Sequence, residues 1–200
     1  MRKTSTVYLV GAGPGDHKLI TVRGQELLEQ ADVVIYDHLV APALLKTCSS
    51  RAKLVYVGKE ATRHTLTQER INHLLIRSAK SGKRVVRLKG GDPFLFGRGG
   101  EEAQALAKAR VPYEVVPGVT SALAVPAYAG IPVTHRALSS SVAIMTGHED
   151  PTKPESAIRW DRATTGCDTL VFLMGVSTLP GIVSQLTRHG RSVKTPCAVI

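Results

Sequence analysis

One stretch of the chain decides the fold: Val85-Val86-Arg87-Leu88-Lys89-Gly90-Gly91-Asp92-Pro93-Phe94-Leu95-Phe96-Gly97-Arg98-Gly99-Gly100-Glu101-Glu102. Residues 85–89 have the apolar, β-branched pattern of a strand. The adjacent glycines at 90 and 91 open a loop, because glycine allows backbone conformations and close approaches that a Cβ forbids. The acids at 101 and 102 suit the first turn of a helix, where negative charge is favourable. This order predicts a ligand site at the carboxyl end of a strand in an open α/β sheet. A plain βα turn is the alternative.

The same alternation of strand and helix extends in both directions from this stretch. Strands are predicted at 6–10, 32–37, 53–57, 85–89, 113–116, 141–146, 169–173 and 196–200. Helices are predicted between them, with Thr21 and Thr67 as N-caps. Repeated βα units indicate a parallel sheet with right-handed crossovers. We expect an α/β fold with two domains, residues 1–134 and 135–200, joined through the segment 130–136.

Composition narrows the classes of function. The chain has 200 residues with a net charge of +10, which suits a polyanionic partner. Aromatic residues make up only 4% of the chain, which argues against base stacking and therefore against nucleic-acid binding. No apolar run is long enough to span a membrane, and the apolar run that follows the short basic prefix is too short for a signal peptide. The three cysteines are widely spaced, and the histidines lack metal-ligand spacing. We therefore expect a cytoplasmic protein without a metal site.

The first glycine-rich loop is not a dinucleotide fingerprint. It reads Gly-Ala-Gly-Pro-Gly-Asp over residues 11–16. Its sixth position is Asp16 where the fingerprint requires glycine or alanine, and Pro14 removes a backbone donor for a pyrophosphate. We therefore do not predict NAD binding.

Candidate chemical groups follow the predicted strands. Asp37 ends an apolar strand, where partial burial would suit a proton acceptor, although a helix N-cap is an equal alternative. Lys59 follows the next strand and could be a surface cation. Asp92 could bind a ribose or an amino group, or it could be a turn residue only. Arg87 and Lys89 alternate along one strand, so both point to one face and could meet an anion.

Blocks of sequence resemble a known family. They cover residues 10–16, 36–40, 57–59, 85–102 and 130–136, with support from 116–122. Together they closely resemble the tetrapyrrole methylase family, and within it the uroporphyrinogen-III C-methyltransferases. The resemblance implies two α/β domains with S-adenosylmethionine in the cleft between them, a homodimer, and S-adenosylhomocysteine as the spent cofactor.

The resemblance also implies roles for individual residues. The proton acceptor falls on Asp37 and the proton donor on Lys59. Arg136 is a weaker candidate for holding substrate carboxylates. Lys89 and Arg87, whose shared face already suggests an anion, are further candidates for the same role. The implied cofactor contacts are Pro14, Gly90, Gly91, Asp92, Leu95, Thr120, Ser121, Met174 and Ala198. For Met174 the resemblance outweighs the ordinary expectation of a core methionine.

The implied reaction fits the charge of the chain. Uroporphyrinogen III is a polycarboxylate, and its pyrrole carbons on rings A and B attack the sulfonium methyl group. The product, precorrin-2, leads to sirohaem and cobalamin. The family extends past residue 200, so we expect the second domain to be incomplete here. Glu60 also stands where the family often has a basic residue.

Three alternatives stay open. Another precorrin methyltransferase would have the same fold and cofactor, but we would not expect it to carry the Asp-x-Leu-Val sequence that begins at Asp37. An RNA methyltransferase of the same superfamily would suit the charge, but not the Gly-Pro-Gly-Asp loop. A cofactor-binding fragment without turnover is the third.

Overall fold

The computed structural model describes residues 4–58, 66–149 and 156–200. The chain divides into two compact units, Met1–Thr120 and Ser121–Ile200. This division comes earlier in the chain than the boundary expected between residues 134 and 135, which as a domain boundary stays a prediction.

Within the described residues, the first unit holds a five-stranded sheet in the order β3-β2-β4-β1-β5. Its strands are β1 (Val7–Gly11), β2 (Val33–Tyr36), β3 (Lys53–Tyr56), β4 (Val85–Lys89) and β5 (Tyr113–Val116). Every pair of neighbouring strands is parallel. The alternation of strand and helix predicted this, since parallel strands need crossover connections. Because the strands all run the same way, their carboxyl ends share one edge.

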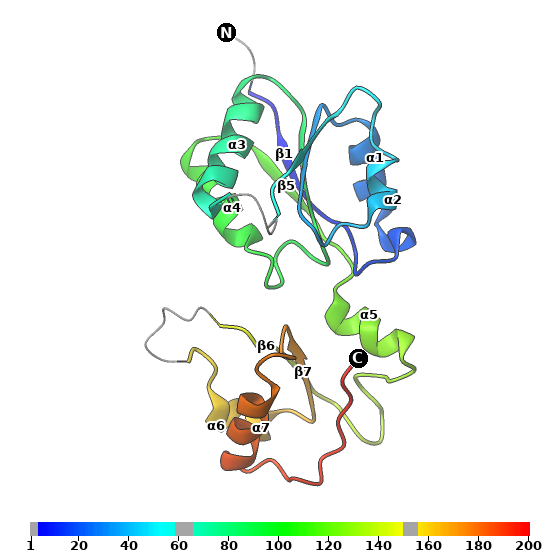
Figure 1. Ribbon diagram of the computed structural model, residues 1–200, viewed down its shortest axis with the longest axis vertical. Coiled ribbons are helices and arrows are strands. Elements are labelled where there is room, and N and C mark those ends of the chain that lie inside the picture. The colour runs from blue at the N-terminus through cyan, green and yellow to red at the C-terminus, as the bar shows by residue number, and fades with distance from the viewer. Residues whose placement is uncertain (1–3, 59–65, 150–155) are drawn as a thin grey trace. The chain divides into compact units, whose positions relative to one another are not determined.

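Helices cover both faces of this sheet. They are α1 (Val22–Glu29), α2 (Pro42–Leu45), α3 (Gln68–Lys80) and α4 (Gly99–Lys108), with a 3-10 turn at His17–Leu19. Figure 1 shows α1 and α2 on one side of the strands and α3 and α4 on the other. The predicted N-caps are confirmed: the Thr21 hydroxyl accepts from Gly24 N at 3.1 Å, and the Thr67 hydroxyl accepts from Arg70 N at 3.3 Å. Each cap satisfies a backbone donor that the helix itself leaves open.

The core is split by the sheet into two layers. Val86 and Leu88 of β4 pack with Leu28 and Leu44 on the α1 and α2 side. Val85 packs with Leu75 of α3 and with other apolar side chains on the opposite side. Burial of each such side chain contributes about 1.5–3 kcal/mol. The alternation along β4 also sends Arg87 and Lys89 into the α3 and α4 side, which positions the charged cluster described below.

The second unit contains a smaller parallel pair, β6 (Val142–Thr146) and β7 (Thr169–Leu173). Its helices among the described residues are α5 (Ser121–Tyr128), α6 (Trp160–Gly166) and α7 (Leu179–Arg188). Trp160 of α6 stacks on Phe172 of β7 with ring centroids 6.0 Å apart. Ile182 of α7 is buried.

The expectation of a strand at 196–200 is wrong. These residues are exposed and form no strand, and within the described residues β6 and β7 alone make up the second sheet. An apolar run becomes a strand only where a neighbour pairs with its backbone groups.

None of the helices in the described ranges has both the length and the apolar character needed to cross a membrane.

Candidate active site

The candidate site lies at the carboxyl edge of the five-stranded sheet. After β2 the chain crosses to β3, which is the strand at one border of the sheet. After β4 it crosses in the opposite direction to β5, the strand at the other border. β2 and β4 are neighbours, so the connections diverge between them. Open α/β sheets bind ligands at such a divergence. Asp37 follows β2 and Gly90 follows β4, so this geometry brings the two predicted segments together.

Three loops at this edge touch backbone to backbone. A Cβ on Gly11 would lie 2.5 Å from the Gly118 Cα and 2.7 Å from the Gly91 carbonyl oxygen. Gly91 N also donates to the Gly13 carbonyl oxygen at 2.7 Å. Side chains at these positions would force the loops after β1, β4 and β5 apart. The glycines therefore bring the three loops together.

Gly90 and Gly91 serve different purposes in the loop after β4. A Cβ on Gly90 would lie 2.5 Å from the Leu39 Cβ, so this glycine makes room for the loop after β2. Gly91 has φ +64, and nothing lies within 4 Å of the position its Cβ would take. Gly91 therefore adopts a left-handed conformation beside open space, where a ligand could approach the bare backbone.

Asp92 organises these loops. Its Oδ1 accepts from Phe94 N at 2.8 Å and Leu95 N at 3.2 Å, which makes it a turn residue. Its Oδ2 accepts from Gly118 N at 3.0 Å, which links the loop after β4 to the loop after β5. Asp92 therefore shapes its own turn and also joins two loops that are far apart in the sequence.

Asp37 is held by two hydrogen bonds. Its Oδ1 accepts from Leu39 N at 3.2 Å, and its Oδ2 accepts from Arg87 Nη2 at 3.1 Å. The helix-cap alternative is wrong, because Ala41 is the N-cap of α2. The Asp37 side chain is 20% exposed. A carboxylate that is fixed in place and still reachable from solvent suits proton transfer.

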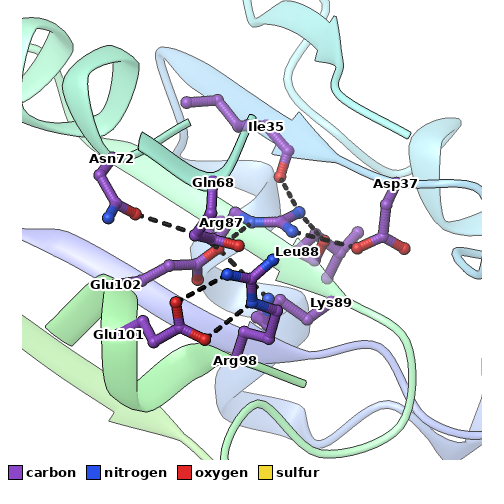
Figure 2. A network of polar contacts seen from close by, with 10 residues as sticks. All are labelled: Ile35, Asp37, Gln68, Asn72, Arg87, Leu88, Lys89, Arg98, Glu101 and Glu102. Atoms are coloured by element: carbon purple, nitrogen blue, oxygen red, sulfur yellow. Dashed lines mark hydrogen bonds and ion pairs between the residues drawn. The ribbon is translucent and has the colours of Figure 1, made fainter. Parts of the chain in front are cut away.

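Arg87 and Lys89 meet a buried anion within the protein. Glu102 of α4 is fully buried, and its Oε1 accepts from Arg87 Nε at 3.0 Å and from Lys89 Nζ at 3.3 Å. Figure 2 shows the Arg87 guanidinium between Glu102 and Asp37. Burial lowers the pKa of the Lys89 ammonium, the nearby Arg87 charge lowers it further, and Glu102 opposes both effects. These cations are internal, with both residues 4% exposed.

Sequence reasoning missed Glu102 as a site residue. The sequence assigned Glu102 only to the first turn of a helix, where negative charge is favourable. In the fold its side chain accepts hydrogen bonds from Arg87 and Lys89. Gln68 of α3 also donates to its Oε1 at 3.3 Å, and among the described residues nothing donates to its Oε2. Two cations on one face of a buried strand were the available signal, because buried charges need a partner.

The remaining predicted residues fall in several places. Pro14 and Leu95 are half-buried in the first unit, and Thr120 ends that unit. Met174 follows β7 with φ 59 and is 54% exposed, so it is not a core residue. Ala198 and Arg136 are exposed, and Ser121 begins α5. Lys59 lies outside the described residues.

The second unit repeats the close approach of glycines at a strand edge. Gly147 follows β6 and Gly175 follows β7, and a Cβ on Gly147 would collide with the Gly175 backbone. The Thr178 hydroxyl donates to the Gly147 carbonyl oxygen at 2.6 Å. This hydrogen bond ties the turn after β7, which contains Met174, to the end of β6.

No group of His, Cys, Asp and Glu side chains within residues 4–58, 66–149 and 156–200 is arranged to hold a metal ion.

Comparison with known proteins identifies the family. The sequence profile of the tetrapyrrole (corrin/porphyrin) methylases matches residues 6–200. The chain belongs to the tetrapyrrole methylase family. A solved tetrapyrrole methylase, the uroporphyrin-III C-methyl transferase of Thermus thermophilus complexed with S-adenyl homocysteine, is 44% identical with a TM-score of 0.79. That match covers 94% of this chain and 78% of the Thermus chain.

Two curated tetrapyrrole methylases are similar over almost the whole chain. The S-adenosyl-L-methionine-dependent uroporphyrinogen III methyltransferase of Methanosarcina barkeri is 53% identical over 97% of this chain and 76% of its own length. The uroporphyrinogen-III C-methyltransferase of Priestia megaterium is 54% identical over 97% of this chain and 81% of its own length. The expected family and fold class are thereby confirmed.

Proposed function

We propose that this protein is an S-adenosylmethionine-dependent uroporphyrinogen-III C-methyltransferase, which methylates rings A and B to give precorrin-2. The observation that carries the proposal is sequence identity: more than half of the aligned residues are the same as in two enzymes named for that activity. The arrangement at the carboxyl edge agrees with it: an accessible, fixed carboxylate stands beside a loop whose backbone is bare at Gly91. The +10 charge suits a polycarboxylate substrate.

Asp37 is the proton acceptor in this proposal. S-adenosylmethionine supplies an electrophilic methyl group on a sulfonium sulfur. Once a pyrrole carbon has gained the methyl group, the ring system carries a positive charge and must lose a proton. The Asp37 carboxylate stabilises the positive charge and then takes the proton. Lys59 stays a predicted proton donor.

The loops at the carboxyl edge bind the cofactor in this proposal. Gly90, Gly91, Leu95, Pro14 and Thr120 offer backbone and apolar contacts, and Asp92 holds the loops in register. The bare left-handed backbone at Gly91 is a cradle that a Cβ would partly fill, which fits a ligand that approaches closely. From the second unit, the proposed cofactor contacts are Ser121, Met174 and Ala198.

The roles of the basic residues divide by exposure. We assign Arg136, which is exposed, to the substrate carboxylates. Arg87 and Lys89 were expected to bind substrate as well, but burial against Glu102 suits them better to support of the site. A buried cation already paired with an internal anion has little left to offer a second one.

A cytoplasmic homodimer that binds neither membranes nor nucleic acid completes the proposal. Free Cys48 and Cys167 and an exposed free Cys197 suit a reducing compartment. The dimer rests on the family resemblance alone.

A product assay tests the function. The full-length protein is mixed with S-adenosylmethionine and uroporphyrinogen III, and the precorrin-2 chromophore and S-adenosylhomocysteine are followed together. We expect two methyl groups transferred for each porphyrinogen. Tight cofactor binding with no transfer would identify a binding protein without turnover. Transfer to a later precorrin only would identify a different precorrin methyltransferase.

A further inference from the structure

Arg87 connects an accessible carboxylate to a buried one. On one side its Nη2 donates to Asp37 Oδ2 at 3.1 Å, and on the other its Nε donates to Glu102 Oε1 at 3.0 Å. Figure 2 shows this row of three side chains, which come from β4, α4 and the end of β2. Only Asp37 has appreciable exposure, since the Arg87 side chain is 4% exposed and that of Glu102 is not exposed.

The Arg87 guanidinium is fixed before it reaches Asp37. Besides the bond to Glu102, its Nη1 donates to the carbonyl oxygens of Leu88 at 3.0 Å and Ile35 at 3.4 Å. A guanidinium is planar and presents its donors as a rigid fork. When Nε and Nη1 are held, the direction of Nη2 follows. The position of Nη2 is therefore set by the packed interior and not by Asp37.

The other side of the Asp37 carboxylate is also held. Leu39 N donates to Oδ1 at 3.2 Å, and Leu39 in turn lies against Gly90 at the start of the loop after β4. Each carboxylate oxygen therefore carries one internal hydrogen bond and keeps lone-pair capacity for a further proton or donor. The plane of the carboxylate is fixed, and the side chain is still 20% exposed.

We propose that Arg87 is the positioning residue for Asp37, anchored from below by Glu102. The inference rests on the proposed function, in which Asp37 accepts the proton. Arg87 does not touch the reacting atoms. It holds the carboxylate in one orientation and supplies the positive charge that keeps a half-buried anion in place.

A double-mutant cycle on kcat tests the proposal in the full-length protein. Arg87→Lys keeps the charge but replaces the rigid fork with a flexible ammonium that cannot make all the same hydrogen bonds at once. We expect Arg87→Lys to lower kcat about tenfold, which corresponds to about 1.4 kcal/mol of activation free energy. Asp37→Asn should lower kcat about 10²-fold. The double variant should equal Asp37→Asn, because Arg87 acts only through the Asp37 carboxylate.

Gln68→Ala is the matched control. Gln68 donates to the same Glu102 oxygen as Arg87 does, but it has no contact with Asp37 among its hydrogen bonds. We expect this variant to lower the urea midpoint while kcat stays within about twofold of the wild type. Cofactor affinity by calorimetry should be unchanged in Gln68→Ala and Arg87→Lys.

The outcomes distinguish a failure of Arg87 as positioning residue from a failure of Asp37 as proton acceptor. If Asp37→Asn turns over like the wild type, the proton acceptor is elsewhere and the proposed role of Asp37 fails. If Asp37→Asn is slow but the Arg87→Lys loss adds fully to it, Arg87 does not act through Asp37 and the positioning role fails alone. The positioning role would also fail if Gln68→Ala lost as much kcat as Arg87→Lys and that loss added fully to the loss in Asp37→Asn, because a general disturbance around Glu102 would then explain both variants.

Discussion

Asp92 Oδ2 accepts a hydrogen bond from Gly118 N at 3.0 Å, although the two residues lie in different loops. Asp92 follows β4 and Gly118 follows β5, and β1 lies between these strands in the sheet. The bond therefore spans the end of β1, where the Gly11 backbone comes close to that of Gly118. One carboxylate holds together the loops that we assign to the cofactor.

Asp92→Ala should weaken S-adenosylmethionine binding about tenfold or more without unfolding the protein. Loss of charge-assisted hydrogen bonds to backbone N–H groups costs roughly 1.5–3 kcal/mol. Titration calorimetry measures the affinity. Asp32→Ala is the control, because Asp32 accepts from Arg84 N at 2.7 Å at the opposite edge of the sheet. It should lose stability and keep its affinity. Equal affinity losses in both variants would contradict a local role for Asp92.

Gly11→Ala should destabilise the protein by about 2 kcal/mol or more, because the new Cβ would meet backbone atoms of two other loops, which cannot move independently. Gly100→Ala is the matched control. Nothing lies within 4 Å of the Cβ position at Gly100, and alanine favours a helix. Urea denaturation should place the control within about 1 kcal/mol of the wild type. If Gly11→Ala and Gly100→Ala had the same urea midpoint, the close contact between Gly11 and the other two loops would not matter for stability, which would contradict this prediction.

Asp37→Asn should keep the fold and cofactor affinity and lose about 10²-fold or more in kcat. Asparagine has nearly the same shape but takes no proton and carries no charge. Steady-state turnover with uroporphyrinogen III measures the effect. Asp32→Asn is the control, since it makes the same change before β2 that Asp37→Asn makes after it. Comparable turnover in the two variants would remove Asp37 from the chemistry.

Substrate capture should weaken as salt rises, while cofactor affinity changes less. Raising the ionic strength from about 0.01 M to about 0.15 M shortens the Debye length from about 30 Å to about 8 Å. We expect kcat/KM for the porphyrinogen to fall over this range. Arg136→Gln should flatten the salt profile more than Arg51→Gln, an exposed cation that precedes β3 at the opposite edge. Identical profiles for the two variants would exclude Arg136 from substrate capture.

Stability should depend on Asp168 at low pH. The Ser140 N–H, followed by the Ser141 hydroxyl, lowers the pKa of the Asp168 carboxyl below its usual 3.8. Because the folded-state value is the lower one, the stabilisation is present above the unfolded value and is lost as pH falls through the folded value. Asp168→Asn should therefore be less stable than the wild type at neutral pH. The gap between their urea midpoints should narrow below pH 3.8; a constant gap would contradict this.

The sequence alone determined the strands of the first unit and the edge of the sheet that carries the site. Runs of β-branched residues gave the strands of the first unit, and Thr21 and Thr67 marked helix starts that the structure confirms. These signals are local, because propensity and capping act within one or two turns of chain. The common edge also followed, since repeated strand-helix units indicate parallel strands, and neighbouring parallel strands need crossover connections of this kind.

Only the tertiary structure decided what the charged residues do. The alternation of Arg87 and Lys89 predicted a shared face, but not that α4 would bring Glu102 beneath it. From the sequence Asp37 was equally compatible with a helix cap, but in the fold Ala41 caps α2 and the Asp37 carboxylate accepts from Arg87. Periodicity fixes which side of an element a residue faces. The partner it meets depends on strand order and helix packing, which bring together residues far apart in the chain, and a single sequence carries no local signal for that contact.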